Sequence, residues 1–110
     1  MENEVIVTPY FEIRYKRLAK KFVSLENDIE DLVATLIETP TYGESLGAGL
    51  YKIRLAVESK GGGKSGGFRI ITYLVNKTKT GTDIYLVAIY DKSEEATMKK
   101  NKLIKLVREI

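Results

Sequence analysis

The chain has 110 residues and carries 18 Lys and Arg against 15 Asp and Glu, which gives a formal net charge of +3, and it contains no cysteine and no histidine. This composition excludes a disulfide framework, a thiolate nucleophile and the imidazole that most often acts as acid, base or metal ligand. Length and hydropathy predict one domain over residues 1–110, with no membrane span, no signal peptide and a cytoplasmic location.

The N-terminal part predicts a short strand followed by a helical hairpin. Residues 4–8 form the strand, and Thr8 with Pro9 is typical of an N-cap and a first helical position. A second apolar stripe over residues 25–37 predicts another helix, with Ser24 as its cap. Because the link is short, the two helices are expected to pack as an antiparallel hairpin. The first helix is expected to bury a face of four residues: Phe11, Tyr15, Leu18 and Phe22.

Three strands are expected after a glycine-bearing loop at 42–49, namely Leu50–Val57, Phe68–Val75 and Ile84–Tyr90. Polar links containing glycine join them into successive hairpins, and a C-terminal helix follows the polar segment 93–101. The order of elements predicts an α+β domain, in which a largely antiparallel four-stranded sheet packs against an N-terminal helical hairpin and a C-terminal helix.

The link between the first two of these strands, SKGGGKSGGFR, contains Gly63-Lys64-Ser65, the end of the nucleotide-binding motif G-x-x-x-x-G-K-[ST]. The motif needs a further glycine where Glu58 stands, and it needs a helix where a strand is predicted. We therefore reject a nucleotide-binding loop. We expect a mobile basic arm, with Lys60, Lys64 and Ser65 closing on a nucleic-acid backbone. The alternative is a long disordered connection.

Basic residues on the strands are predicted to converge on one face of the sheet. Side chains alternate along a strand, so Lys52 and Arg54 project together, away from the apolar side chains of their strand. Symmetric closure of the first hairpin places Arg69 opposite Ala56, and closure of the second places it opposite Tyr90. The predicted cluster holds four cations and a tyrosine: Lys52, Arg54, Arg69, Lys92 and Tyr90. Clustered like charges repel, which favours a bound anion, and the alternative is a solvated strand face.

Three segments resemble the RelE/ParE superfamily of bacterial toxins, and in particular its HigB/RelE-like branch: KIRL at 52–55, KSGGFR at 64–69 and YDKS at 90–93. The similarity covers nearly the whole chain, including the order of the elements. It implies a ribosome-dependent endoribonuclease that cuts messenger RNA in the ribosomal A site. It also implies a cognate helix-turn-helix antitoxin that holds the toxin inactive.

The chemistry implied by this resemblance needs no metal and no cofactor. The 2′-hydroxyl of the RNA attacks the adjacent phosphorus, so a base, an acid and cations for the phosphate charge are required. We predict Lys52 as the base, Lys92 as the acid and Arg69 as the phosphate stabiliser. Arg54 is a second electrostatic contact, and Tyr90 stacks on a base or assists proton transfer. Arg17 and Lys20 of the first helix are either a solvated face or an extension of the RNA footprint.

Two features of the sequence depart from the toxin pattern. Arg54 stands where a second lysine is common, and Met98 and Asn101 occupy a stretch where related toxins place a tyrosine or histidine. The proton-transfer roles are therefore less secure than the electrostatic role of Arg69.

Two other functions stay open: a ParE-like inhibitor of DNA gyrase that is not an enzyme, against which the set of cations argues, and an inactive basic RNA-binding relative.

Overall fold

The computed structural model describes residues 2–77 and 81–110. Its helices and strands follow one another in the order β1 (Glu4–Val7), α1 (Pro9–Lys21), α2 (Leu25–Glu38), β2 (Glu44–Gly47), β3 (Leu50–Leu55), α3 (Gly63–Gly66), β4 (Phe68–Lys77), β5 (Gly81–Asp91), the 3₁₀ helix η1 (Lys92–Thr97) and α4 (Lys100–Val107). No helix in these ranges is both long and apolar enough to cross a membrane.

The described strands form one mixed sheet in the order β1-β5-β4-β3-β2, where β1 runs parallel to β5 and the other pairs are antiparallel. The α+β class and the two helical regions are as expected, but a four-stranded sheet is wrong because β2 adds a fifth strand. This strand lies in the segment predicted as a loop. Positive φ angles at Gly47, Ala48 and Gly49 reverse the chain there, so that Glu44 and Ser45 pair with β3.

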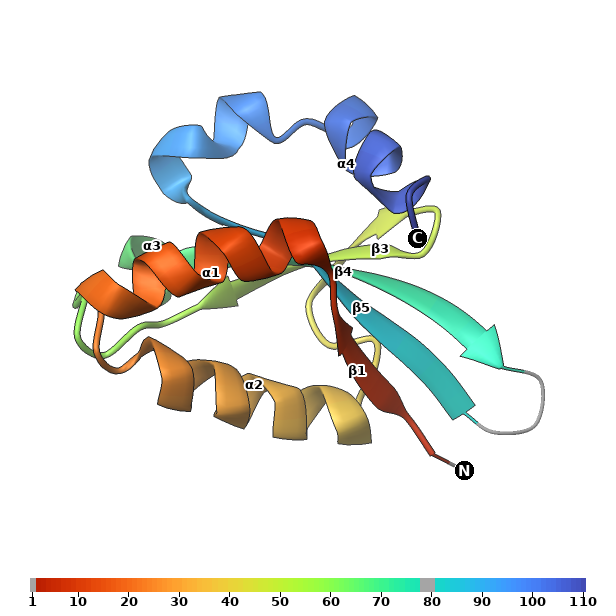
Figure 1. Ribbon diagram of the computed structural model, residues 1–110, viewed down its shortest axis with the longest axis horizontal. Helices are drawn as coiled ribbons and strands as arrows, with labels where there is room; N and C mark the ends of the chain where they lie inside the picture. The colour runs from red at the N-terminus through yellow and green to blue at the C-terminus, as the bar shows by residue number, and fades with distance from the viewer. Residues whose placement is uncertain (1, 78–80) are drawn as a thin grey trace.

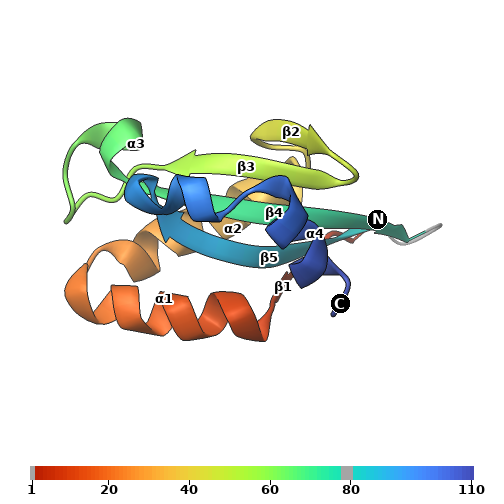
Figure 2. The same ribbon diagram turned by 90° about the horizontal axis from the view of Figure 1, so that it is seen from above.

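Helices cover both faces of the sheet (Figures 1 and 2). α1 and α2 pack on one face against Ile53, Ile70 and Ile89, and Phe11 of α1 is 1% exposed. η1 and α4 lie on the opposite face, where Met98 and Leu103 pack against strand residues. Side chains alternate between the two faces of each strand, and apolar strand residues also occur on the face that η1 and α4 cover. The sheet therefore has a second apolar face and not a polar face open to solvent.

The start of α1 confirms the predicted cap, and the start of α2 does not. Thr8 Oγ1 accepts a hydrogen bond from Phe11 N at 3.4 Å, and Thr8 N donates to Leu86 O, so α1 begins where β1 leaves β5. Ser24 makes no side-chain cap. Its hydroxyl instead bonds Asp28 and accepts a bond from Ser59 N at 2.8 Å, which ties α2 to the glycine-rich link.

The pairing of β4 with β3 differs from the predicted register by two residues, and the pairing of β4 with β5 is as predicted. Arg69 lies opposite Tyr90, as expected, but its partner on β3 is Arg54 and not Ala56. The ladder ends at Leu55 because Val57 turns into the core beside α2, where it is 1% exposed. A shift of two residues keeps every side chain on its face, so the two arginines still share one surface.

The segment after β5 is more ordered than its polar composition predicts. Residues 92–97 form η1, and Asp91 and Glu94 build a capping box at its start. Asp91 accepts a hydrogen bond from Ser93 N at 3.1 Å, and Glu94 accepts one from Asp91 N at 3.1 Å. The capping box therefore fixes how the chain turns from the sheet onto its second face.

Candidate functional site

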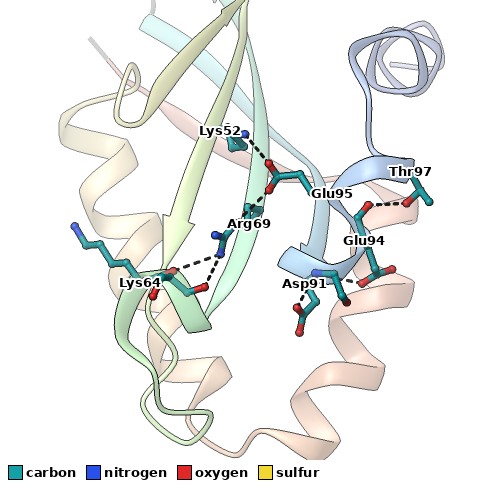
Figure 3. Close-up of polar contacts among 9 residues, drawn as sticks. Lys52, Lys64, Arg69, Asp91, Glu94, Glu95 and Thr97 are labelled. Carbon is teal, nitrogen blue, oxygen red and sulfur yellow. Dashed lines mark hydrogen bonds and ion pairs between the residues drawn. The ribbon is translucent and has the colours of Figure 1, made fainter.

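A carboxylate from η1 lies among the cations of the sheet (Figure 3). Glu95 accepts a hydrogen bond from Lys52 Nζ on its Oε2 atom at 3.2 Å, and its Oε1 atom lies 3.3 Å from Arg69 Nε. Lys52 comes from β3 and Arg69 from β4. Three separate segments of the chain thus converge on one point, and one acidic side chain bridges two of the predicted cations.

Arg69 is the most deeply placed member of this group, with 3% of the residue exposed. Its Nη1 atom lies 3.4 Å from the carbonyl oxygens of Lys64 and Ser65, near the upper limit for a hydrogen bond. Its Nε atom faces Glu95 without the alignment of a hydrogen bond. Arg54, a like charge, is its cross-strand neighbour. A buried cation with such long contacts is suited to receive an anion.

The charges around Glu95 decide its protonation. Burial raises the pKa of its carboxyl, but the hydrogen bond and charge of Lys52, together with the charges of Arg69 and Arg54, outweigh burial and hold that pKa below its usual range. Glu95 is therefore ionised at neutral pH. Three cations face one carboxylate, so an excess of positive charge remains for a further anion.

The neighbouring residue, Glu94, holds η1 in place. Its carboxylate accepts hydrogen bonds from Arg14 Nη2 of α1 at 2.7 and 2.5 Å, in addition to its capping bond from Asp91 N. The hydrogen bond from Arg14 lowers the pKa of Glu94, and burial opposes it. Because α1 anchors Glu94 from one side, the next side chain, Glu95, is directed toward the strands.

We expect the stability of the protein to fall in acid. The pKa values of Asp91, Glu94 and Glu95 are lowered in the folded state, so these groups stabilise the fold above the pKa of the unfolded carboxyls, near pH 4, and this stabilisation is lost as the pH falls through their lower folded values. Urea unfolding between pH 7 and pH 3 measures the loss. The variant Glu94→Gln should show a flatter dependence, and an unchanged profile would contradict the role of this carboxylate.

Tyr90 lies beside Arg69 in the sheet and is 1% exposed. Burial raises the pKa of its phenol to about 12, the charge of Glu95 acts in the same direction and Arg69 opposes both. At neutral pH the phenol is therefore protonated and cannot accept a proton. It contributes an apolar ring and a hydroxyl to the wall of the site.

The buried phenol predicts a loss of stability in alkali. Above about pH 10 an unfolded tyrosine loses its proton, whereas folded Tyr90 keeps it until about pH 12. The unfolded state is therefore favoured as the pH rises, by at most about 1.4 kcal/mol per pH unit from this group. Urea unfolding of the wild type and of Tyr90→Phe at pH 9, 10 and 11 isolates this contribution. Equal slopes in the two proteins would exclude it.

The glycine-rich link is folded back on itself rather than extended as a basic arm. Lys60 Nζ donates to Gly66 O at 2.6 Å and lies 3.3 Å from a carboxylate oxygen of Asp91, so this ammonium closes the link onto the end of β5. Ser65 donates to Gly62 O within the one-turn helix α3. The side chain of Lys64 is exposed and points away from Arg69 (Figure 3). Among the predicted contacts of this link, Lys64 is the cation whose ammonium remains accessible to a ligand.

Three other predicted residues lie outside the group around Glu95. Lys92 is the exposed first residue of η1, so the expectation that it continues the face of β5 is wrong: the strand ends at Asp91. Arg17 and Lys20 are exposed on α1. Within residues 2–77 and 81–110, none of these three forms an ion pair or a side-chain hydrogen bond.

Two hollows flank Lys52. One, of about 350 Å³, is lined by Tyr42, Gly43, Glu44, Lys52, Ile53, Arg54 and Lys64. The other, of about 270 Å³, is lined by Leu46, Lys52, Tyr90, Glu95, Met98, Lys100 and Leu103. A third hollow, of about 300 Å³, is mainly apolar, lies between β1, β5 and α4, and shares no lining residue with them. The two hollows that share Lys52 are together called the basic trough; their lining of cations with one partly apolar end suits a chain of nucleotides.

Among the residues that line this trough, sequence reasoning missed the charged side chains of Glu95 and Lys100 at the end formed by η1 and α4. Both lie in the segment 93–101, which carries no helical or strand periodicity. The capping box of Asp91 and Glu94 was the available signal, because it predicts a helical turn that starts at residue 92. The described residues contain no group of three or more acidic side chains that could hold a metal ion.

The mixed sheet, the N-terminal helical hairpin and the C-terminal helix place the chain in the RelE-like class of α+β folds. A solved structure of the E. coli toxin RelE, a double arginine-to-alanine mutant in the free state, superposes with a TM-score of 0.64 over 94% of this chain and 99% of that chain, at 15% sequence identity. No family model matches the chain. No curated protein matches it either.

Proposed function

We propose that the protein is the toxin of a type II toxin–antitoxin system and belongs to the HigB/RelE-like branch, acting as a ribosome-dependent endoribonuclease on messenger RNA in the A site of the small subunit. One observation carries this proposal. Lys52 and Arg69 converge on the carboxylate of Glu95: Lys52 lines the basic trough, which Arg54 and Lys64 extend, and Arg69 is buried beside Glu95. The RelE-like fold supports it.

The arrangement fits metal-free cleavage by the 2′-hydroxyl of the RNA. The attack places additional negative charge on the phosphate oxygens, and preorganised cations stabilise that charge most effectively where water is excluded. Arg69 is buried and fixed by the strands on both sides, so its guanidinium meets these conditions. Arg54 and Lys64 line one of the two hollows beside Lys52, where we propose that the RNA backbone continues, and Tyr90 lines the other.

A toxin of this kind acts in the cytoplasm and requires an inhibitor while the cell grows. The partner that we propose is a helix-turn-helix antitoxin, which keeps the trough from reaching the ribosome. The exposed cations of α1, Arg17 and Lys20, lie outside the trough and are proposed to contact ribosomal RNA. This electrostatic contribution should weaken as the salt concentration rises.

A translation extract tests the proposal directly. Purified protein is added to an extract that translates a defined message, and primer extension then maps new RNA ends. We expect ends at codon boundaries that appear only when ribosomes are present. A parallel assay measures DNA supercoiling by purified gyrase, which a ParE-like inhibitor would block. Absence of new RNA ends together with blocked supercoiling would replace the ribonuclease with a gyrase inhibitor, and absence of both effects would indicate an inactive relative.

A further inference from the structure

The cations of the site leave open which group takes the proton from the attacking hydroxyl. The ionisable side chains that act on Glu95 come from three strands: Lys52 and Arg54 on β3, Arg69 on β4 and Tyr90 on β5, while Lys100 of α4 lines the same hollow. A general base must hold an electron pair at neutral pH and must lie within hydrogen-bond reach of the reacting atoms. Each of these groups can be judged by that requirement.

Glu95 is the member of this group that meets the requirement. Arginine stays protonated in proteins, and Tyr90 is a protonated phenol whose pKa is raised to about 12. Lys52 donates to Glu95 at 3.2 Å, so it takes part as an ammonium, which has no electron pair for a proton. The carboxylate of Glu95, in contrast, is ionised and accepts from these cations.

We propose that Glu95 is the general base of the RNA cleavage proposed above, and that Lys52, its hydrogen-bond partner, is the acid that protonates the leaving oxygen. This inference rests on the proposed function. It revises the roles expected from the sequence, where Lys52 was the base and Lys92 the acid. Lys92 is exposed and starts η1, whereas Lys52 and Glu95 are already in contact.

The proposed step balances without any further reactant. The 2′-oxygen forms a bond to phosphorus while its proton passes to the carboxylate of Glu95. The bond from phosphorus to the 5′-oxygen breaks, and that oxygen takes a proton from the ammonium of Lys52. The products are a 2′,3′-cyclic phosphate and a 5′-hydroxyl. Afterwards Glu95 is neutral and Lys52 is an amine. Transfer of one proton across their 3.2 Å hydrogen bond restores both groups.

Contacts from other elements fix the backbone that carries Glu95. Arg14 and Asp91 hold the preceding residue, Glu94, so the backbone of η1 is fixed from α1 and from β5. Glu95 lies on the Nε side of Arg69. The Nη1 atom makes long contacts of 3.4 Å with the carbonyl oxygens of Lys64 and Ser65, so a phosphate oxygen would bind Nη2 or replace those contacts. A carboxylate and a phosphodiester can share the site because Lys52, Arg54 and Arg69 exceed their combined charge.

The test measures single-turnover cleavage on ribosomes loaded with a defined message. Glu95→Gln and Glu95→Ala are expected to slow the chemical step by about 10²- to 10⁴-fold, and Glu95→Asp less. Affinity for the loaded ribosome, measured with a message that lacks the 2′-hydroxyl at the cleavage site, should stay the same or increase. The matched control is Glu38→Gln, which removes the same charge at the exposed end of α2, on the other side of the sheet.

Two further measurements separate a base from a structural role. Added formate should restore part of the rate of Glu95→Ala but not that of Glu95→Gln, with chloride of equal ionic strength as the control. A message with a 5′-bridging sulfur at the cleavage site has a leaving group that needs no proton. It should restore the rate of Lys52→Ala and leave Glu95→Gln slow.

The outcomes distinguish this inference from the function on which it rests. If the wild type cleaves and Glu95→Gln cleaves as fast or faster, Glu95 is not the base, and a faster variant identifies it as a carboxylate that blocks the phosphate position. Slow cleavage by Glu95→Ala that formate leaves unchanged also overturns the role. If the wild type itself does not cleave, the proposed function fails and this inference fails with it.

Discussion

Replacing Arg69 with methionine is expected to remove most of the RNA cleavage and to leave the fold at least as stable as in the wild type. The loss of rate should be about 10²- to 10³-fold, the usual cost of removing one preorganised contact to a charge that develops in the transition state. Stability should not fall, because Arg69 is buried opposite Arg54 and its ion pair is with Glu95, whose side chain is 41% exposed. An apolar side chain of similar length avoids the desolvation of a buried cation.

This prediction is checked by single-turnover cleavage and by urea unfolding of the same preparations. Arg69→Ala should show the same loss of cleavage with a lower stability, because it leaves a cavity in a buried position beside Tyr90. Arg108→Met is the matched control, since Arg108 is exposed after α4. Arg69→Met that cleaves at the wild-type rate would remove the main support for the proposed function.

The sequence was most informative where residues repeat with a period. Alternation along Leu50–Val57 predicted a strand that presents Lys52 and Arg54 to one side, and the structure confirms that face in the observed strand, Leu50–Leu55. Closure of the second hairpin placed Arg69 opposite Tyr90, as observed. These predictions succeed because a strand fixes which side chains share a face, whatever lies further along the chain.

The predictions failed for the segments that form β2 and η1, whose structure depends on tertiary contacts and not on local sequence preference. β2 has four residues and no alternation, and it forms because positive φ angles at residues 47–49 bring it back onto β3. η1 depends on a capping box and on Arg14 of a distant helix. Glu95 contacts Lys52, 43 positions away, and its neighbour Glu94 is held by Arg14, 80 positions away, so no local pattern encodes the site.

The largest loss of stability is expected from Gly67→Ala. Gly67 lies between α3 and the first residue of β4, Phe68, and its φ of −83° is one that alanine adopts readily. The obstacle is steric. A Cβ atom at this position would stand 1.8 Å from Leu55 O and 3.1 Å from the Cα atom of Ala56, and both belong to the backbone of the neighbouring chain segment. Neither can turn aside as a side chain does.

Relieving this overlap requires β3 and β4 to separate at the end that positions Arg54 and Arg69. We therefore expect Gly67→Ala to lower the free energy of unfolding by about 3 kcal/mol or more, at the upper end of the cost of overpacking. Gly61→Ala is the control. Gly61 has a φ of +75° but no atom within 4 Å of the added methyl group, so it should cost about 1–2 kcal/mol for the left-handed backbone.

Urea unfolding of the two variants, read beside their cleavage rates, tests whether the close approach of Gly67 to Leu55 supports the site. Gly67→Ala should lose cleavage even in the fraction that remains folded, because Arg54 and Arg69 face each other only two residues from the point of separation. Gly61→Ala should cleave at nearly the wild-type rate once corrected for its folded fraction. Equal stability of the two variants would mean that the β3–β4 pair adjusts without cost, and that the cations do not depend on this close backbone contact for their positions.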